Sequence, residues 1–301
     1  MGQEFTVLIS VYKKEKAENL EKALHSITVS QTLCPSQIVL VEDGPLTEEL
    51  YHVIETYKKR FPNLFDVVAL KENMGLGNAL NEGIKYCRYD LVARMDSDDI
   101  SVEDRFEKQI AYMNSFDDIA VCGGHIAEFY VRPSQIITVK RMPLIHRDIV
   151  KRMKWRNPMN HVTIVFRKKA VLSAGGYKEL PYLEDYYLWI RMLDKGYHFA
   201  NLDSVMVMVR TGRDMFRRRG NKALLKGWFI LQNSMYRMKF ISIWEAVRNL
   251  FAATCFIYCP STVKRILYER LLREKKQTHK HFLPLGEYSR KFCFLKRRKG
   301  N

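Results

Sequence analysis

The sequence predicts an α/β fold, with an open sheet flanked by helices and a basic helical segment after it. Two observations in the first hundred residues predict the sheet. Short apolar, β-branched runs alternate with amphipathic segments, and each apolar run is continuous. Continuous apolar strands separated by helices are typical of parallel β-α-β units covered on both faces. The third observation is charge, because the net +17 of the chain resides in its last third.

Strands and helices are expected to alternate as far as residue 99. In the first helix, Leu20, Leu24 and Ile27 recur at the helical period. Ligands of open α/β sheets bind at the carboxyl ends of the strands, so we expect the functional site at that edge. Strands are expected at 5–12, 37–44, 65–75 and 90–99, with helices at 17–30, 47–61 and 76–87 between them.

After residue 117 the pattern changes to strands that are neighbours in the chain and to shorter helices. A turn at Arg132–Pro133 separates the first two of these strands. We expect strands at 119–131, 135–142 and 203–212, a helix at 146–155, a strand and a short helix ending in a Gly-Gly turn within 161–177, and a helix at 183–197. The domain boundary is placed after residue 212, which gives a main domain over 1–212 and a basic helical region over 213–301.

The basic region contains 23 Lys or Arg and 5 Asp or Glu over residues 205–301. Such a charge attracts nucleic acid, anionic lipid or a phosphorylated substrate. Helices are expected at about 221–239, 243–258 and 261–275. The apolar segment 250–258 is too short to cross ~30 Å of hydrocarbon. It is either a helix lying in the plane of a membrane surface or part of a helical subdomain packed on the sheet.

Six cysteines are scattered along the chain without a C-x-x-C pair. This spacing supports neither a zinc site nor a disulfide framework, and it is consistent with a reducing cytosol. The amino-terminal segment reads as the first strand and not as a signal peptide. We therefore expect a cytoplasmic protein, bound peripherally at the inner face of the cell membrane if the basic region meets lipid.

The densest group of acids follows the fourth expected strand, in the sequence Asp96-Ser97-Asp98-Asp99. Two carboxylates one residue apart can reach one oxygen-seeking cation, and Mg²⁺ or Mn²⁺ is commonly held by one or two carboxylates together with substrate phosphates. Such a cation neutralises a diphosphate leaving group. The alternative is that Asp99 and Ser101 cap a helix that begins near residue 102.

Five segments in a fixed order identify a family resemblance over roughly residues 4 to 210. They are "VLISVYKKEKAENLEKALHSI", "QIVLVEDGP", "NMGLGNALNEGI", "ARMDSDD" and "GGY…LEDYYLWIRML". Together they resemble the inverting glycosyltransferases of family 2, which have the GT-A fold, a mixed sheet flanked by helices. The resemblance implies a nucleotide-sugar donor, a divalent Mn²⁺ or Mg²⁺ ion, and single-displacement transfer to an acceptor hydroxyl.

The resemblance also assigns the donor side of the site, residue by residue. Asp43 would hydrogen-bond the nucleotide base, although it could instead cap the turn at Gly44-Pro45. Arg94 would contact the donor, although it could instead balance the nearby acids. Asp98 would be the main metal ligand, and Asp96 would contact the ribose or the metal. The remaining donor-side residues are Ser10, Tyr12 and Glu15, which would border the nucleotide, and Asn73, Gly75, Asn78 and Asn81, which would shape the loop beneath it.

The acceptor side is assigned from "LEDYYLW". Inversion needs a carboxylate opposite the leaving group to accept the proton of the attacking hydroxyl, and Asp185 is the expected base. Glu184 would orient it or contact the acceptor. The alternative is a pair of acids favoured by the dipole at a helix start. His161 is either a substrate contact or structural, and Trp189 is expected in the core.

Arg210, Arg213 and the run Arg217–Arg219 could bind a donor or acceptor phosphate, since a guanidinium donates two parallel hydrogen bonds. The alternative is solvated surface charge. The Gln-x-x-Arg-Trp motif of processive synthases is missing after residue 210, which favours the addition of one sugar per encounter.

Three functions follow from these observations. The first is a glycosyltransferase that uses a nucleotide sugar, with uracil as the favoured base, and an acceptor that is a saccharide or is linked to polyprenyl diphosphate. It would act at an anionic membrane surface in bacterial capsule, exopolysaccharide or O-antigen synthesis. The second is a nucleotidyltransferase, which is disfavoured because "SVYKKEKAENL" has no glycine. The third is a non-catalytic nucleic-acid-binding protein that uses residues 205–301. We disfavour this third function and expect no nucleic acid partner.

Overall fold

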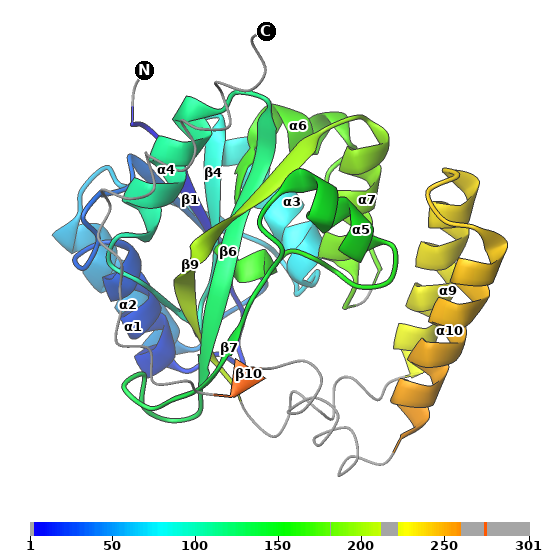
Figure 1. Ribbon diagram of the computed structural model, residues 1–301. Helices are drawn as coiled ribbons and strands as arrows, with labels where there is room; N and C mark the ends of the chain where they lie inside the picture. Colours follow the sequence, from blue (N-terminus) through cyan, green and yellow to red (C-terminus); the bar gives the residue numbers. More distant parts are fainter. Residues whose placement is uncertain (1–2, 181, 212–221, 260–273, 276–301) are drawn as a thin grey trace, which may run out of the picture.

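A computed structural model describes residues 3–180, 182–211, 222–259 and 274–275 of the chain. Its centre is a mixed sheet with helices on both faces (Figure 1). Helices α1, α2 and α4 cover one face, and α3, α5, α6 and α7 cover the other. The predicted α/β class with a mixed sheet is therefore confirmed.

The amino-terminal half of the sheet is parallel, as expected. Its strands lie in the order β3-β2-β1-β4 and are joined by α1, α2 and α3. The strands are β1 (Thr6–Val11), β2 (Gln37–Glu42), β3 (Phe65–Ala69) and β4 (Leu91–Asp96), and the helices are α1 (Ala17–Ile27), α2 (Glu48–Arg60) and α3 (Leu76–Tyr86). Strand β3 ends earlier than predicted, because residues 70–75 form a loop instead.

The second half adds antiparallel strands next to β4. Strand β8 pairs antiparallel with both β4 and β6, β7 pairs antiparallel with β6, and β9 runs parallel to β6. The strands are β5 (Ile100–Ser101), β6 (Ile119–Phe129), β7 (Ile136–Lys140), β8 (Val165–Arg167) and β9 (His198–Arg210), and the helices are α4 (Arg105–Ser115), α5 (His146–Met153), η1 (His161–Thr163), α6 (Lys168–Ser173) and α7 (Glu184–Asp194). Strand β9 begins five residues before the predicted strand.

Alternate residues of β1 serve the two halves of the core. Val7 and Ile9 pack toward α1 and α4, whereas Leu8 packs toward α3 and α7. This period of two is the pattern of a strand buried on both faces. Trp189 is fully buried in the α7 side of the core, as predicted.

Two antiparallel helices, α9 (Lys222–Arg237) and α10 (Ile243–Tyr258), stand beside the sheet domain (Figure 1). Helix α10 starts with a capping box between Ser242 and Glu245. Leu231, Met235 and Ile241 are buried in the same core cluster as α7. The pair is thus packed on the main domain on one side. Within the described residues, no helix combines the length and apolar character needed to cross a membrane.

The third helix expected in the basic region, over 261–275, lies outside the described residues except for its last two. Those two form strand β10 (Glu274–Lys275), which pairs antiparallel with β7. For these two residues the helix prediction is wrong.

Candidate active site

The site lies where β1, β2 and β4 end. Ser10 on β1 is in register with Val41 of β2 and with Asp96 of β4. Tyr12 and Glu15 follow β1 in a turn closed by a hydrogen bond from the Glu15 amide to the Tyr12 carbonyl. The carboxyl ends of neighbouring parallel strands meet at one edge of the sheet, which brings these residues together as predicted.

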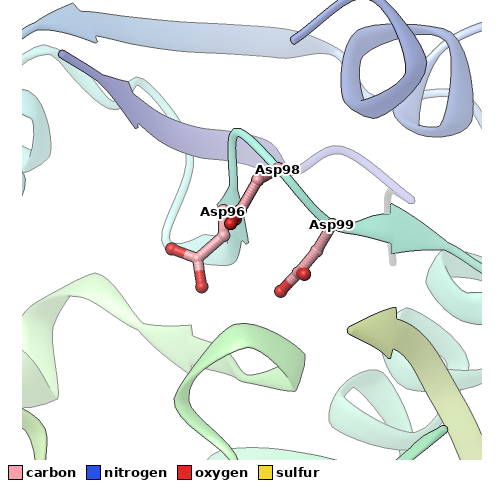
Figure 2. Close-up of side chains that lie close together, drawn as sticks. All are labelled: Asp96, Asp98 and Asp99. Carbon is pink, nitrogen blue, oxygen red and sulfur yellow. The ribbon is translucent and has the colours of Figure 1, made fainter. Parts of the chain in front are cut away.

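The carboxylates of Asp96, Asp98 and Asp99 lie close together at the end of β4 (Figure 2). One oxygen from each lies within 4.8 Å of the others. Asp99 Oδ1 accepts a hydrogen bond of 2.8 Å from the Arg210 amide, so β9 fixes its position. The capping alternative is wrong, because α4 begins only at Arg105 and Ser101 lies in β5.

The pKa values of the cluster show uncompensated negative charge. Burial, and then the charges of Asp96 and Glu15, raise the pKa of Asp98 to about 7. Burial and the neighbouring Asp98 and Asp96 raise the pKa of Asp99 well above its ordinary value. A divalent cation would relieve this repulsion, and an all-oxygen ligand set suits Mg²⁺ or Mn²⁺. The residues present therefore fit a divalent metal.

Arg94 is the cation already present beside the cluster. Its side chain is 2% exposed, and both of its terminal nitrogens donate to Asp96, Nη1 to Oδ2 at 2.7 Å and Nη2 to Oδ1. The charge-balancing alternative is therefore correct for Asp96. Arg94 Nε has no hydrogen-bond partner among the described residues. Because Arg94 occupies both oxygens of Asp96, Asp98 and Asp99 are the acids of the cluster with more capacity for a cation.

A second buried arginine, Arg105, hydrogen-bonds the backbone near the end of β4. Arg105 is fully buried, and its Nη2 donates to the Arg94 carbonyl at 2.7 Å while its Nε donates to Gln109 Oε1 at 3.0 Å. Burial, and then the positive charge of Arg94, lower the pKa of Arg105 to about 9. Sequence reasoning missed Arg105, because an arginine in the first turn of an amphipathic helix is ordinarily exposed.

Arg210 and Glu15 both contact the segment that carries the acidic cluster. Arg210 Nε donates to the Asp98 carbonyl at 3.3 Å, and its guanidinium lies 4.9 Å from the ring centroid of Phe129. Glu15 Oε2 accepts from the Ser97 hydroxyl at 3.4 Å. Both predicted residues thus reach the site. Arg213 and Arg217–Arg219 lie outside the described residues.

Asp43 is buried and fastens the loop before α3. Its Oδ1 accepts from the Met74 amide at 2.6 Å, and its Oδ2 accepts from Asn73 Nδ2 at 2.9 Å and from the Gly75 amide at 3.2 Å. Gly44 has a φ of +82°, and a Cβ there would lie 2.7 Å from the Asn73 amide nitrogen. The carboxylate therefore holds a loop thirty residues away and does not cap its own turn.

Asn81 joins α3 to the segment that leads into α7. Its Nδ2 donates to the Tyr177 carbonyl at 2.6 Å, and its Oδ1 accepts from the Tyr177 amide at 2.7 Å. Gly77 allows a close approach, since a Cβ there would lie 3.3 Å from Glu184 Cγ. Asn78 Nδ2 donates to the carbonyl of Met74, in the loop just before α3, at 3.0 Å. In this structure Asn81 therefore holds the backbone of Tyr177.

Asp185 is half-buried in the first turn of α7, with both oxygens already engaged. Oδ2 accepts from Asn157 Nδ2 at 2.7 Å, and Oδ1 accepts from the Tyr186 amide at 2.7 Å. Burial raises the pKa of Asp185, and hydrogen bonds from Tyr186 and Asn157 oppose the rise. Burial also raises the pKa of Glu184, and the charge of Asp185 adds to it. A carboxylate with a raised pKa is a better proton acceptor.

His161 and Tyr177 form a polar pair between the two acidic groups. Their Nε2 and Oη atoms are 2.8 Å apart. Burial and the positive charge of Arg94 lower the pKa of His161 well below its ordinary value, so the imidazole is neutral. His161 also meets the edge of Trp189, at 6.0 Å between ring centroids. Its bonding in this structure is to protein groups.

The positive charge of Arg94 acts on both groups of acids, those after β4 and those in the first turn of α7. Its positive charge lowers the pKa of Asp98, of Glu184 and of Asp185. The pKa of Tyr177 is raised chiefly by burial, and also by the negative charges of Asp185 and Asp96. The acids after β4 and those of α7 thus share one electrostatic neighbourhood at the same rim.

Asn157 and Tyr177 contribute to this site and were not predicted. Asn157 lies in "RNPMN", where its only signal is a polar residue before proline, which is ordinary in a loop. Tyr177 follows the Gly-Gly turn that the sequence does indicate. No periodic pattern in the sequence indicates either contact.

Comparison with known proteins gives the same picture. The family model for glycosyl transferase family 2 matches residues 6–176. An amylovoran biosynthesis glycosyltransferase of Erwinia amylovora is 43% identical over 237 residues, which are 78% of this chain and 85% of the relative. The UDP-Gal:alpha-D-GlcNAc-diphosphoundecaprenol beta-1,3-galactosyltransferase of Escherichia coli is 32% identical over 269 residues, 89% of this chain and 96% of the relative.

Solved structures share the fold. S. aureus TarS 1-349 in complex with UDP-GlcNAc has a TM-score of 0.63 and 17% identity, with 88% of this chain and 76% of that chain covered. The mannosyltransferase of Pyrobaculum calidifontis in complex with GDP-Man and Mn2+ has a TM-score of 0.58 and 14% identity, with 88% and 80% covered. At these identities the likeness establishes the GT-A fold.

Proposed function

Because the chain belongs to glycosyltransferase family 2, we propose that it transfers one sugar, with inversion, from a nucleoside-diphosphate sugar to an acceptor hydroxyl. The observation that carries the proposal is the placement of two acidic groups around Arg94. One group, Asp96, Asp98 and Asp99, suits the diphosphate end of a donor with its cation. The other, Glu184 and Asp185, suits the proton of an attacking hydroxyl.

The donor side uses the rim of β1, β2 and β4. Ser10, Tyr12 and Glu15 border the nucleotide, and Asp43 with the 73–75 loop receives the base. Arg94, held against Asp96, keeps its positive charge near the donor phosphates. A uridine nucleotide is favoured, because the Escherichia coli relative uses UDP-Gal and the TarS structure holds UDP-GlcNAc.

A divalent cation completes this donor site. Asp98 and Asp99 would hold it, with Asp96 beside them, and the Pyrobaculum mannosyltransferase of the same fold was solved with Mn2+. When bound, the ion neutralises the charge that develops on a diphosphate leaving group. Arg210 stabilises the same region, because its main chain fixes Asp99 and its side chain reaches the Asp98 carbonyl.

Asp185 is the proposed base. Each of its oxygens keeps a lone pair beyond the hydrogen bonds from Asn157 and Tyr186, so the carboxylate can accept the proton of an acceptor hydroxyl. Its raised pKa favours that acceptance. Glu184, next in the first turn, contacts the acceptor. His161, neutral and paired with Tyr177, lines the space between base and donor.

The acceptor that we propose is a saccharide on a polyprenyl diphosphate, in the synthesis of a bacterial surface polysaccharide. The Escherichia coli relative acts on GlcNAc-diphosphoundecaprenol, and the Erwinia relative takes part in amylovoran biosynthesis. Such an acceptor is anchored in lipid, so the enzyme would work in the cytoplasm, peripherally at the inner membrane surface. The basic region over 213–301 is the proposed contact with anionic lipid.

The family match favours glycosyl transfer over nucleotidyl transfer and over nucleic-acid binding. The experiment that tests the proposal is a thermal-shift screen of nucleotide sugars with Mn²⁺, followed by Asp98→Asn. A ligand that binds only the folded state raises its melting temperature. We expect one UDP-sugar to stabilise the wild type, and Asp98→Asn to lose both the Mn²⁺-dependent stabilisation and turnover.

Asp117→Asn is the matched control, because Asp117 is exposed and pairs with Arg167, which is in register with Leu91 at the opposite end of β4 from the site. It should keep the shift. If Asp98→Asn retains Mn²⁺-dependent stabilisation and turnover, the proposed metal site is refuted.

A further inference from the structure

Helix α10 exposes an apolar stripe along its outer face. The stripe consists of Trp244, Val247, Phe251, Cys255 and Tyr258, all exposed. The side chains of Trp244 and Phe251 are 80% and 72% exposed, respectively. From Trp244 to Tyr258 the stripe is about 21 Å long at 1.5 Å per helical residue. Contiguous apolar surface of this kind marks an interaction site more often than chance exposure.

The opposite face of α10 is fixed to the protein. Asn249 is buried, and its Nδ2 donates to the Lys154 carbonyl at 2.7 Å and to Gln232 Oε1 at 2.8 Å. Ala246 and Ile257 are buried on the same side. Helix α10 therefore cannot turn its stripe inward without breaking these contacts.

The charge around the stripe is positive. Residues 222–258 contain five Lys or Arg and one acid, Glu245. The Glu245 carboxylate already accepts a hydrogen bond from the Ser242 amide in the capping box. Arg248 is exposed on α10 itself, and Lys226 and Arg237 are exposed on α9. An apolar stripe on a helical pair with net positive charge is complementary to a surface that is apolar beneath and anionic at its face.

We propose that the stripe docks α10 in the plane of an anionic lipid surface. Trp and Tyr favour the boundary between water and hydrocarbon, and they occupy the two ends of the stripe. An amphipathic helix with aromatics on one face and cations beside them lies in such an interface. The inference deepens the proposed function, since it names the surface through which the enzyme meets a lipid-anchored acceptor.

The docking surface is linked mechanically to the proposed base. On α9, a Cβ at Gly227 would lie 3.3 Å from Leu183 Cδ1, and Trp228 meets the Tyr186 ring edge-on at 6.2 Å. Leu183 and Tyr186 flank Glu184 and Asp185 in the chain. A lipid surface that holds α10 thereby sets the position of the base-bearing turn relative to the membrane.

The first test is flotation of the full chain with vesicles of phosphatidylglycerol and phosphatidylcholine, at low and at raised salt. Trp244→Ser/Phe251→Ser is compared with Tyr86→Ser/Val131→Ser, which changes two exposed apolar side chains outside α9 and α10. We expect the stripe variant to lose on the order of a hundredfold in vesicle partition at raised salt, because two large aromatic side chains no longer enter the lipid. The control variant should bind like the wild type.

The second test uses Cys255, which lies in the stripe, and Cys34, which is exposed elsewhere. Alkylation by a water-soluble maleimide is followed for each peptide by mass spectrometry. Vesicles should slow the labelling of Cys255 at least tenfold and leave Cys34 unchanged.

Equal flotation of the stripe variant and the wild type would overturn the proposal, since basic charge alone would then hold the protein. So would equal labelling of Cys255 with and without vesicles. A dimer that dissociates in Trp244→Ser/Phe251→Ser would assign the stripe to a second copy instead. Neither test needs donor or turnover, so each can fail while sugar transfer to a water-soluble acceptor succeeds.

Discussion

Arg94 is buried among carboxyl groups that it only partly neutralises. It pairs with Asp96, and it lowers the pKa of Asp98 without preventing the rise to about 7. A group whose folded pKa is raised stabilises the fold below its unfolded pKa, and that stability is lost as pH rises through the folded value. The metal-free cluster therefore destabilises the fold progressively as the pH rises from about 4 to about 7. A bound cation would reverse the effect, which links donor binding to stability.

Asn157 holds the proposed base, and its removal should change the pH dependence of transfer. The hydrogen bond from Asn157 lowers the pKa of Asp185. In Asn157→Ala that pKa rises further, and since the base acts when ionised, the acidic limb of kcat/KM moves to higher pH by about 0.5–1 unit. The pH–rate profiles of wild type and variant measure this shift.

Gln37→Ala serves as the control for that profile. It also removes a buried amide, one that donates to the Tyr86 carbonyl and accepts from the Arg88 amide at the amino end of β2, opposite the site. It should lower stability and leave the acidic limb in place. An unmoved limb in Asn157→Ala would argue that Asp185 is not the group seen in the profile.

At the scale of elements, the loop between β3 and α3 is held by Asp43, the residue that follows β2. Asp43 binds three groups of residues 73–75, and Gly44 lets that loop approach its backbone. The donor base is proposed to meet this joint. Its geometry depends on the lack of a side chain at residue 44.

Gly44→Ala should therefore weaken donor binding as well as the fold. The new Cβ would meet the Asn73 amide at 2.7 Å, and φ is +82°. Gly196→Ala is the matched control, because its φ is +81° with no atom within 4 Å of the new Cβ. Both should lose about 1–2 kcal/mol to the positive φ. Only Gly44→Ala should lose more stability and also lower donor affinity, measured by denaturation and by calorimetry. Equal effects of the two variants on donor affinity would contradict the role of this joint.

The elements themselves were largely predictable from the sequence. Strand 37–42 has a continuous apolar run over 38–41, and helices such as 48–60 carry one apolar stripe, so these patterns identify them. The pairing of β8 between β4 and β6 was not predictable. Strand β8 has three residues, too few to show a period, and its place is decided by contacts between segments more than forty residues apart.

At the scale of the molecule, the site joins the two halves of the sheet domain, and the helical pair packs against the first turn of α7. The acids after β4 follow from a local motif, so the sequence could place them at the rim. The Asn157–Asp185 bond and the burial of Arg105 depend on how distant segments pack. No residue type or spacing in the chain announces such contacts.

Trp228 tests the support that α9 gives to α7. In Trp228→Ala the edge contact with Tyr186 is lost, and we expect a loss of about 2 kcal/mol in stability together with a lower kcat. Phe229→Ala is the control, because its side chain is 61% exposed. In vesicle-free buffer with a water-soluble acceptor, that variant should behave like the wild type. A Trp228→Ala enzyme with unchanged melting temperature and kcat would show that α9 does not support the base.

The most direct test of the shared site is Asp185→Asn, with donor affinity and sugar transfer measured on the same preparation. The donor is the nucleotide sugar selected by thermal shift, in the presence of Mn²⁺. We expect unchanged donor affinity and a fall in transfer on the order of a thousandfold or more, since the proton acceptor is removed while the acids after β4 remain. Transfer near the wild-type rate would show that Asp185 is not the base.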